Sequence, residues 1–83
     1  MNKMKLHAKL IDLGVVEEEQ DTVIIKESQP IGELKSTYII VISGLGNVAT
    51  YIFHNNKLVM IEGNNIHVSD IEKLKKLDLE EFE

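Results

Sequence analysis

The segment TYIIVISGLGNVATYIFHNNKLVMIE, which spans Thr37–Glu62, decides the fold of this chain. Two turn patterns divide it into three stretches that are rich in β-branched and aromatic residues. Gly44–Asn47 contains two glycines, and Asn55–Asn56 suits a two-residue type I′ turn because asparagine tolerates positive φ angles. The segment therefore predicts three consecutive antiparallel strands.

Counting outward from the two turns predicts which residues share a face of this sheet. A four-residue loop at Gly44–Asn47 sets the first register, and a two-residue turn at Asn55–Asn56 pairs Ile52 with Val59. Because directly opposed residues point to the same side, both hairpins define the same two faces. Face one collects Tyr38, Ile40, Ile42, Ala49, Tyr51, Phe53, Leu58 and Met60, and face two collects Ile39, Val41, Thr50, Ile52, Val59 and Ile61.

Face two is almost as apolar as face one, and only Thr50 interrupts it. An antiparallel sheet with one wet face normally alternates apolar and polar residues, which this one does not. Leaving its large aliphatic side chains in water would forgo roughly 1.5–3 kcal/mol for each of them. We therefore expect face two to be covered by a helix, a second copy of the chain or another protein. The favoured arrangement has both helices on face one and a partner on face two.

Amphipathic helices are predicted on both sides of this segment. In residues 2–13 three leucines recur at the spacing of one helix face, although every second residue in Met4–Leu10 is also apolar, which leaves a strand possible. Gly14 can then end the helix in the left-handed conformation. Towards the C-terminus, Ser69 and Glu72 match a capping box that starts a second helix.

Shorter elements are predicted between these parts. Val15–Glu18 and Thr22–Lys26 have the pattern of two short strands in an N-terminal hairpin, and residues 27–35, which include the only proline, have that of a loop. The predicted fold class is α+β. Its antiparallel sheet combines a central three-strand meander with the N-terminal hairpin, flanked by an N-terminal and a C-terminal helix. With 83 residues, we expect a single domain, 1–83, with an acidic tail at 78–83.

Composition argues against several classes of function. The net charge is −5 and all nine basic residues are lysines, so we expect no nucleic-acid partner. The absence of cysteine excludes disulfides and thiolate metal sites. No apolar run approaches the roughly 20 residues of a transmembrane helix, and the N-terminus does not resemble a signal peptide. We therefore expect a cytoplasmic protein with no membrane partner.

The sequence contains no catalytic, cofactor or metal motif. The three histidines, His7, His54 and His67, lack the spacing of metal-binding motifs. Gly44–Gly46 precedes a strand, whereas a dinucleotide-binding loop needs a helix N-terminus after the turn. We therefore predict no enzyme, no cofactor and no metal. One alternative stays open, a small-ligand-binding or enzymatic domain whose pocket holds His54 or His67 beside a carboxylate.

The expected function is protein binding. We expect a small intracellular interaction module, such as a regulator or inhibitor, of the kind found among accessory and phage-encoded proteins. A homodimer is favoured because a two-fold axis lets one apolar patch cover itself. The acidic cluster at 17–21 would add contacts, and with the tail it would mimic nucleic-acid charge if both lay on the same side. The tail itself is either a fraying end or a docking segment. The candidate partner-binding residues are Ile39, Val41, Ile52, Val59, Ile61, Glu17, Glu18, Glu19, Asp21, Leu79 and Phe82.

Overall fold

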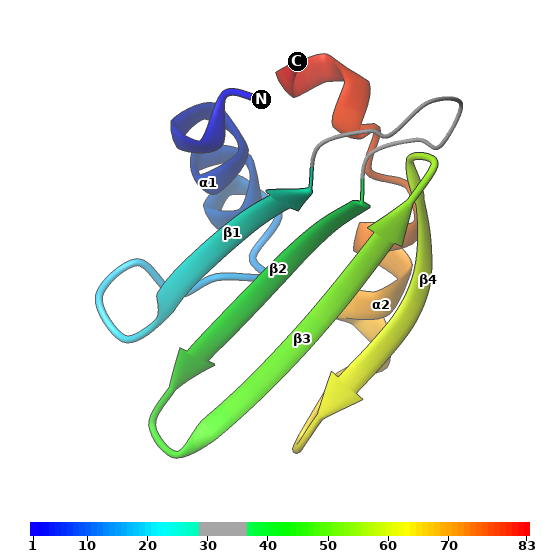
Figure 1. The fold of residues 1–83 in the computed structure, drawn as a ribbon. Coiled ribbons are helices and arrows are strands. Elements are labelled where there is room, and N and C mark those ends of the chain that lie inside the picture. Colours follow the sequence, from blue (N-terminus) through cyan, green and yellow to red (C-terminus); the bar gives the residue numbers. More distant parts are fainter. Residues whose placement is uncertain (29–36) are drawn as a thin grey trace.

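The computed structural model describes residues 1–28 and 37–83, which fold into an antiparallel sheet backed by helices (Figure 1). Along the chain the elements are α1 (Lys3–Asp12), β1 (Thr22–Ser28), β2 (Thr37–Gly44), β3 (Asn47–His54), β4 (Lys57–Gly63), α2 (Val68–Lys75) and the 3-10 helix η1 (Leu79–Phe82). The four strands lie in sequence order, β1-β2-β3-β4. The predicted α+β class is confirmed, and so are the helix that precedes the strands in the chain and the helix that follows them. Residues 29–36, which include most of the predicted loop, lie outside the described residues.

Both helices pack on face one of the sheet, as Figure 1 shows, and the core lies between them and the strands. Every buried strand residue belongs to the predicted face one. Within residues 1–28 and 37–83, no helix is long and apolar enough to cross a membrane. The core residues are Leu6, Leu10, Val15, Val16, Tyr38, Ile40, Ile42, Tyr51, Phe53, Leu74, Leu77, Leu79 and Phe82.

The end of α1 explains why the predicted strand at Val15–Glu18 does not form. Gly14 has a φ of 78°, and its amide donates to the carbonyl of Ile11 at 3.0 Å. The amide of Val15 donates to the carbonyl of Leu10 at 3.1 Å, which completes a Schellman motif. This turn directs both valines into the core, so the segment is not extended. The predicted N-terminal hairpin is therefore wrong, and β1 pairs with β2 instead.

Both hairpin turns of the central segment are two-residue turns. Leu45 and Gly46 have φ angles of 48° and 81°, and Asn55 and Asn56 have φ angles of 54° and 61°, as a type I′ turn requires. The first loop is therefore shorter than the predicted four residues. The register of β2 against β3 is nevertheless the predicted one, because Gly44 and Asn47 lie directly opposite each other as a pair.

Leucine is a strained choice in the first turn. A positive φ costs a non-glycine residue roughly 1–2 kcal/mol, and asparagine less. The side chain of Leu45 is also exposed, so it adds little packing. Leu45→Asn is therefore expected to raise the free energy of unfolding by about 0.5–1 kcal/mol in urea denaturation. Leu45→Ala removes the same side chain but keeps the strain, so an equal gain from both variants would contradict this explanation.

A β-bulge changes the predicted face assignment in β4 beyond Leu58. Ile52 pairs with Met60 and not with Val59, which is the extra residue of the bulge, so that predicted pairing is wrong. The shift moves Met60 to face two. It moves Ile61 to face one, where it packs against the core. A bulge bends an edge strand, and here the bend lets the end of β4 curl toward the core.

α2 begins at Val68, two residues before the start that a Ser69 cap predicts. Its N-cap is His67, whose carbonyl accepts hydrogen bonds from the amides of Asp70 and Ile71, and no side chain caps the helix. The predicted capping box of Ser69 and Glu72 is therefore wrong. The carboxylate of Asp70 in the first turn supplies the negative charge that a helix N-terminus favours.

The acidic C-terminus is neither a fraying end nor an exposed docking segment. η1 places Leu79 and Phe82 in the core, where they are 1% and 3% exposed. Asn56 in the second hairpin turn fastens η1, because its side chain accepts from the Leu79 amide at 2.6 Å and donates to Asp78 at 2.6 Å. Leu79 and Phe82 therefore pack inside the protein and do not offer anchors to a partner.

Tyr38 makes a second link between the sheet and the C-terminus. Its hydroxyl donates to the carboxylate of Glu83 at 2.5 Å. Burial, this hydrogen bond and the charge of Glu27 raise the pKa of Tyr38 well above its ordinary value. The folded protein therefore holds this proton to a higher pH than the unfolded chain does.

Stability is accordingly expected to fall at alkaline pH. The unfolded tyrosine loses its proton above about pH 10, so the free energy of unfolding is unaffected below that pH and falls by about 1.4 kcal/mol per pH unit above it. Urea denaturation between about pH 8 and 12 measures this slope. Tyr38→Phe is expected to make the slope shallower, and an unchanged slope would rule Tyr38 out as a cause.

Candidate functional site

Apolar side chains gather on face two of the sheet. We define the face-two patch as Ile24, Ile39, Val41, Val48, Ile52, Val59 and Met60. The strand pairing places all of them on this face except Val59, the unpaired bulge residue, which the alternation after Leu58 assigns to it. Val59 and Met60 are 59% and 54% exposed, and Ile24 and Val48 are exposed as well. Figure 1 shows that neither α1 nor α2 covers this face. Contiguous apolar patches on a protein surface commonly mark interaction sites.

The patch contains most, but not all, of the aliphatic residues predicted for it. Ile39, Val41, Ile52 and Val59 lie there, whereas Ile61 faces the core because of the bulge. Three members were not predicted. Ile24 joins through the pairing of β1 with β2, Val48 lies opposite Ser43 of β2, and Met60 arrives through the bulge.

Polar and charged residues lie around the patch. His54 and Lys57 lie next to the Asn55–Asn56 turn, and Glu62 lies towards the other end of β4. Nδ1 of His54 lies 3.2 Å from Oγ1 of Thr37 across the strands. β4 therefore carries a cation near one end and a carboxylate near the other, both on the side of the patch.

The two acidic clusters lie at opposite ends of the strands. In the Glu17–Asp21 turn the carboxylate of Asp21 accepts a hydrogen bond from the amide of Glu17 at 2.8 Å, and the three glutamates are exposed. This turn lies against Gly44, at one end of β2. The 78–83 segment is bonded to Asn56, in the turn at the other end of the sheet. A mimic of nucleic-acid charge would need both clusters on one side, which this arrangement does not provide.

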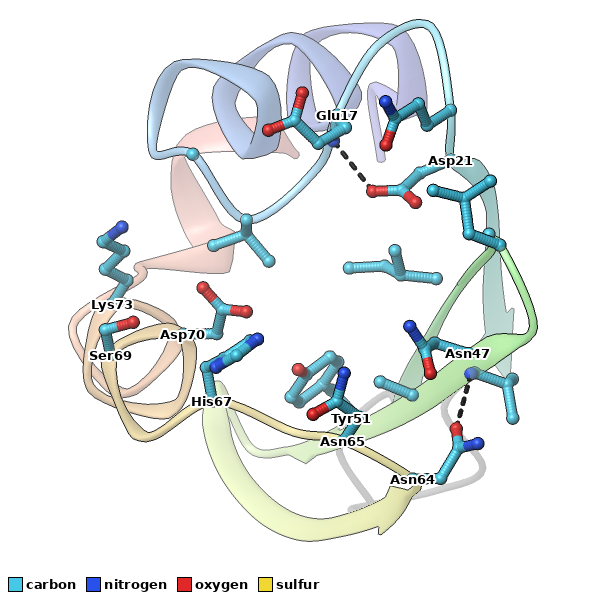
Figure 2. A pocket seen from close by; sticks show the side chains of 18 residues that line it. Glu17, Asp21, Asn47, Tyr51, Asn64, Asn65, His67, Ser69, Asp70 and Lys73 are labelled. Carbon is cyan, nitrogen blue, oxygen red and sulfur yellow. Dashed lines mark hydrogen bonds between the residues drawn. The ribbon is translucent and has the colours of Figure 1, made fainter.

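A pocket of about 470 Å³ opens on face one, at the end of the sheet where Gly44–Asn47 lies (Figure 2). The Glu17–Asp21 turn forms one wall, and the start of α2 with the segment before it forms the opposite wall. Ile42 and Tyr51 of the sheet also line it. Its volume lies within the range of small-molecule sites, about 300–1,000 Å³.

Polar side chains converge on this pocket from separate elements. Because α2 begins at Val68, His67 and Asp70 both lie on its wall, and Figure 2 shows them on the same side as Tyr51. Burial, and then the charge of Asp70, raise the pKa of Tyr51. The polar residues that line the pocket are Glu17, Gln20, Asp21, Asn47, Tyr51, Asn64, Asn65, His67, Ser69, Asp70 and Lys73.

The pocket has the feature on which the small-ligand alternative depends. His67 lies beside a carboxylate, that of Asp70, whereas His54 lies on face two and does not line the pocket. The sequence pattern assigns Tyr51 to face one of the sheet, and Asn64 and Asn65 directly follow the last strand. No sequence pattern brings these residues together, because the path of the α1–β1 connection decides which turn meets α2.

The chain matches no protein-family model, and no curated protein or solved structure is significantly similar to it. In the part of the chain that the structure describes, no group of three histidine or acidic side chains is arranged to hold a metal ion. The face-two patch and the pocket are therefore the two candidate functional sites.

Proposed function

We propose that this protein is a small protein-binding module that acts by binding and not by catalysis, with the face-two patch as its contact surface. The observation that carries the proposal is an apolar sheet face that neither helix covers. Each large aliphatic side chain kept in water forgoes roughly 1.5–3 kcal/mol. A chain of this length has a net stability of only about 4–12 kcal/mol, so covering the patch is a large gain.

The partner that we propose is a second copy of the chain. A two-fold axis in the plane of the contact, perpendicular to the strands, lays the patch on itself and lays one β4 over the other in the opposite direction. It places Lys57 of one copy over the Glu62 end of the other. By symmetry this complementary contact occurs twice, whereas an axis along the strands would place Lys57 over the Ser28 end of β1, near Lys26.

The size of the face suits a modest interface. Four strands about 4.8 Å apart, with seven residues of about 3.3 Å each, span a plane of about 450 Å². The protruding side chains add to this area, which brings it toward the roughly 600 Å² per partner of the smaller specific interfaces. We therefore expect a dimer that dissociates on dilution.

Ile52→Lys tests this proposal because Ile52 lies within the patch on a central strand. Sedimentation equilibrium is expected to show a wild-type mass that rises to the dimer value with concentration, and a folded Ile52→Lys variant that stays monomeric. The half-buried lysine can extend its charge to solvent, so circular dichroism should remain that of the wild type.

Met4→Lys is the matched control, since Met4 is exposed on α1, away from the patch. It introduces the same charge and is expected to leave dimerisation unchanged. A wild type that stays monomeric up to about 1 mM, where an association of about −4 kcal/mol would be detected, would overturn the proposed dimer. Equal loss of dimer in both lysine variants would remove face two as the interface.

A further inference from the structure

Tyr51 gives the face-one pocket a feature that packing alone does not explain. The side chain is 2% exposed and lines the pocket, and Figure 2 shows it among the polar groups there. Its hydroxyl has no hydrogen-bond partner among the described residues, unlike that of Tyr38, which donates to Glu83. Among the described residues no buried side-chain polar atom lacks a partner, so this hydroxyl is open to the pocket, where a bound molecule can hydrogen-bond to it.

The charged groups around the pocket indicate the sign of such a molecule. Glu17 and Asp21 lie on one wall and Asp70 lies on the opposite wall, as Figure 2 shows. Against these three carboxylates the lining contains one lysine, Lys73, and one histidine, His67. None of the three carboxylates forms an ion pair with a described residue. The excess of negative charge favours a cation.

We propose that this pocket binds a small organic cation that carries a primary amine or guanidinium group. The N–H groups of the cation donate to the carboxylate of Asp70 and to the hydroxyl oxygen of Tyr51, and Glu17 adds negative charge from the opposite wall. The carboxylate of Asp21 already accepts a hydrogen bond from the Glu17 amide, so its main contribution to the pocket is negative charge. Asn64 and Asn65 offer neutral hydrogen-bonding groups to the rest of the ligand.

The hydroxyl of Tyr51 stays protonated at neutral pH, because the ordinary pKa of tyrosine is about 10 and burial and the charge of Asp70 raise it further. Its oxygen can therefore accept a hydrogen bond from the ligand. This site lies on face one and does not depend on the face-two patch, so its test and that of the dimer are separate.

Titration with putrescine and agmatine, followed by two-dimensional amide NMR of the full chain, tests the proposal. At constant ionic strength we expect saturable shifts at Glu17, Tyr51 and Asp70 with both cations. Butane-1,4-diol matches putrescine in length without its charges and is expected to leave these signals in place. The absence of saturable shifts with both cations, or equal shifts with the diol, would overturn the proposal.

Variants separate the pocket from the charge of the whole protein. Tyr51→Phe and Asp70→Asn are each expected to weaken putrescine binding by at least about fivefold, as loss of one hydrogen bond predicts. Tyr51→Phe should fold normally, because it removes no hydrogen bond between described residues. Glu17→Gln with Asp70→Asn removes two negative charges from the pocket, and Glu80→Gln with Glu81→Gln removes two from exposed positions on η1. Equal weakening by both pairs would show non-specific attraction and contradict the proposed site.

Discussion

Replacing Phe82 with alanine is expected to destabilise the protein by about 3–5 kcal/mol, a large share of a net stability of about 4–12 kcal/mol. Phe82 is 3% exposed and belongs to the core. η1, which carries it, also contacts α1, and the amide of Asn2 donates to the carbonyl of Phe82. The truncation therefore leaves a cavity between several elements that cannot easily close.

Glu81→Gln provides the matched control, because Glu81 is the exposed neighbour of Phe82 in η1. A surface change of this kind is expected to alter the free energy of unfolding by no more than about 0.5 kcal/mol. Urea denaturation followed by circular dichroism measures both variants. If Phe82→Ala were as stable as Glu81→Gln, the C-terminal segment would be a solvated tail after all.

Gly63→Ala is expected to have the next largest effect, a loss of about 2–4 kcal/mol from strain and crowding together. Gly63 has a φ of 150°, a region that side chains disfavour. A Cβ atom there would lie 2.8 Å from Cα of Ala49 and closer still to the carbonyl oxygen of Val48. The side chain of Asn64 also accepts from the amide of Val48 at 2.8 Å, so a shift of this strand end would break that bond.

Gly46→Ala separates the cost of backbone strain from the cost of steric crowding. Gly46 also has a positive φ, 81°, but a Cβ atom there would meet nothing within 4 Å. Its substitution should therefore cost only the roughly 1–2 kcal/mol of backbone strain. Thermal or urea unfolding that gave the same loss for both alanine variants would contradict the crowding at Gly63.

The strand pattern was predictable wherever local chemistry decided it. Asn55–Asn56 requires a tight turn, and the alternation in β2 and β3 then fixes which residues are buried. The bulge was not predictable, because Val59 and Met60 are both apolar and an extra residue between them leaves the pattern unbroken. The position of the bulge depends on how β4 curls toward the core, which is a tertiary effect.

The other features that the sequence did not predict also depend on residues far away in the chain. Leu79 and Phe82 have the spacing of an exposed helical docking face, but Asn56, twenty-odd residues earlier, holds their segment against the core. Likewise the sequence around Tyr51 predicts a core residue. Its hydroxyl reaches the pocket only because the Glu17–Asp21 turn and the start of α2 stand apart there.

The central claim, that face two binds a second copy of the chain, can be tested by isotope-filtered NMR on a mixture of labelled and unlabelled protein. Such an experiment detects only contacts between copies. The proposed dimer predicts contacts among the methyl groups of Ile24, Ile52, Val59 and Met60. In a sample whose mass is that of a dimer, contacts confined to α1, α2 or η1, with none from these four side chains, would contradict it.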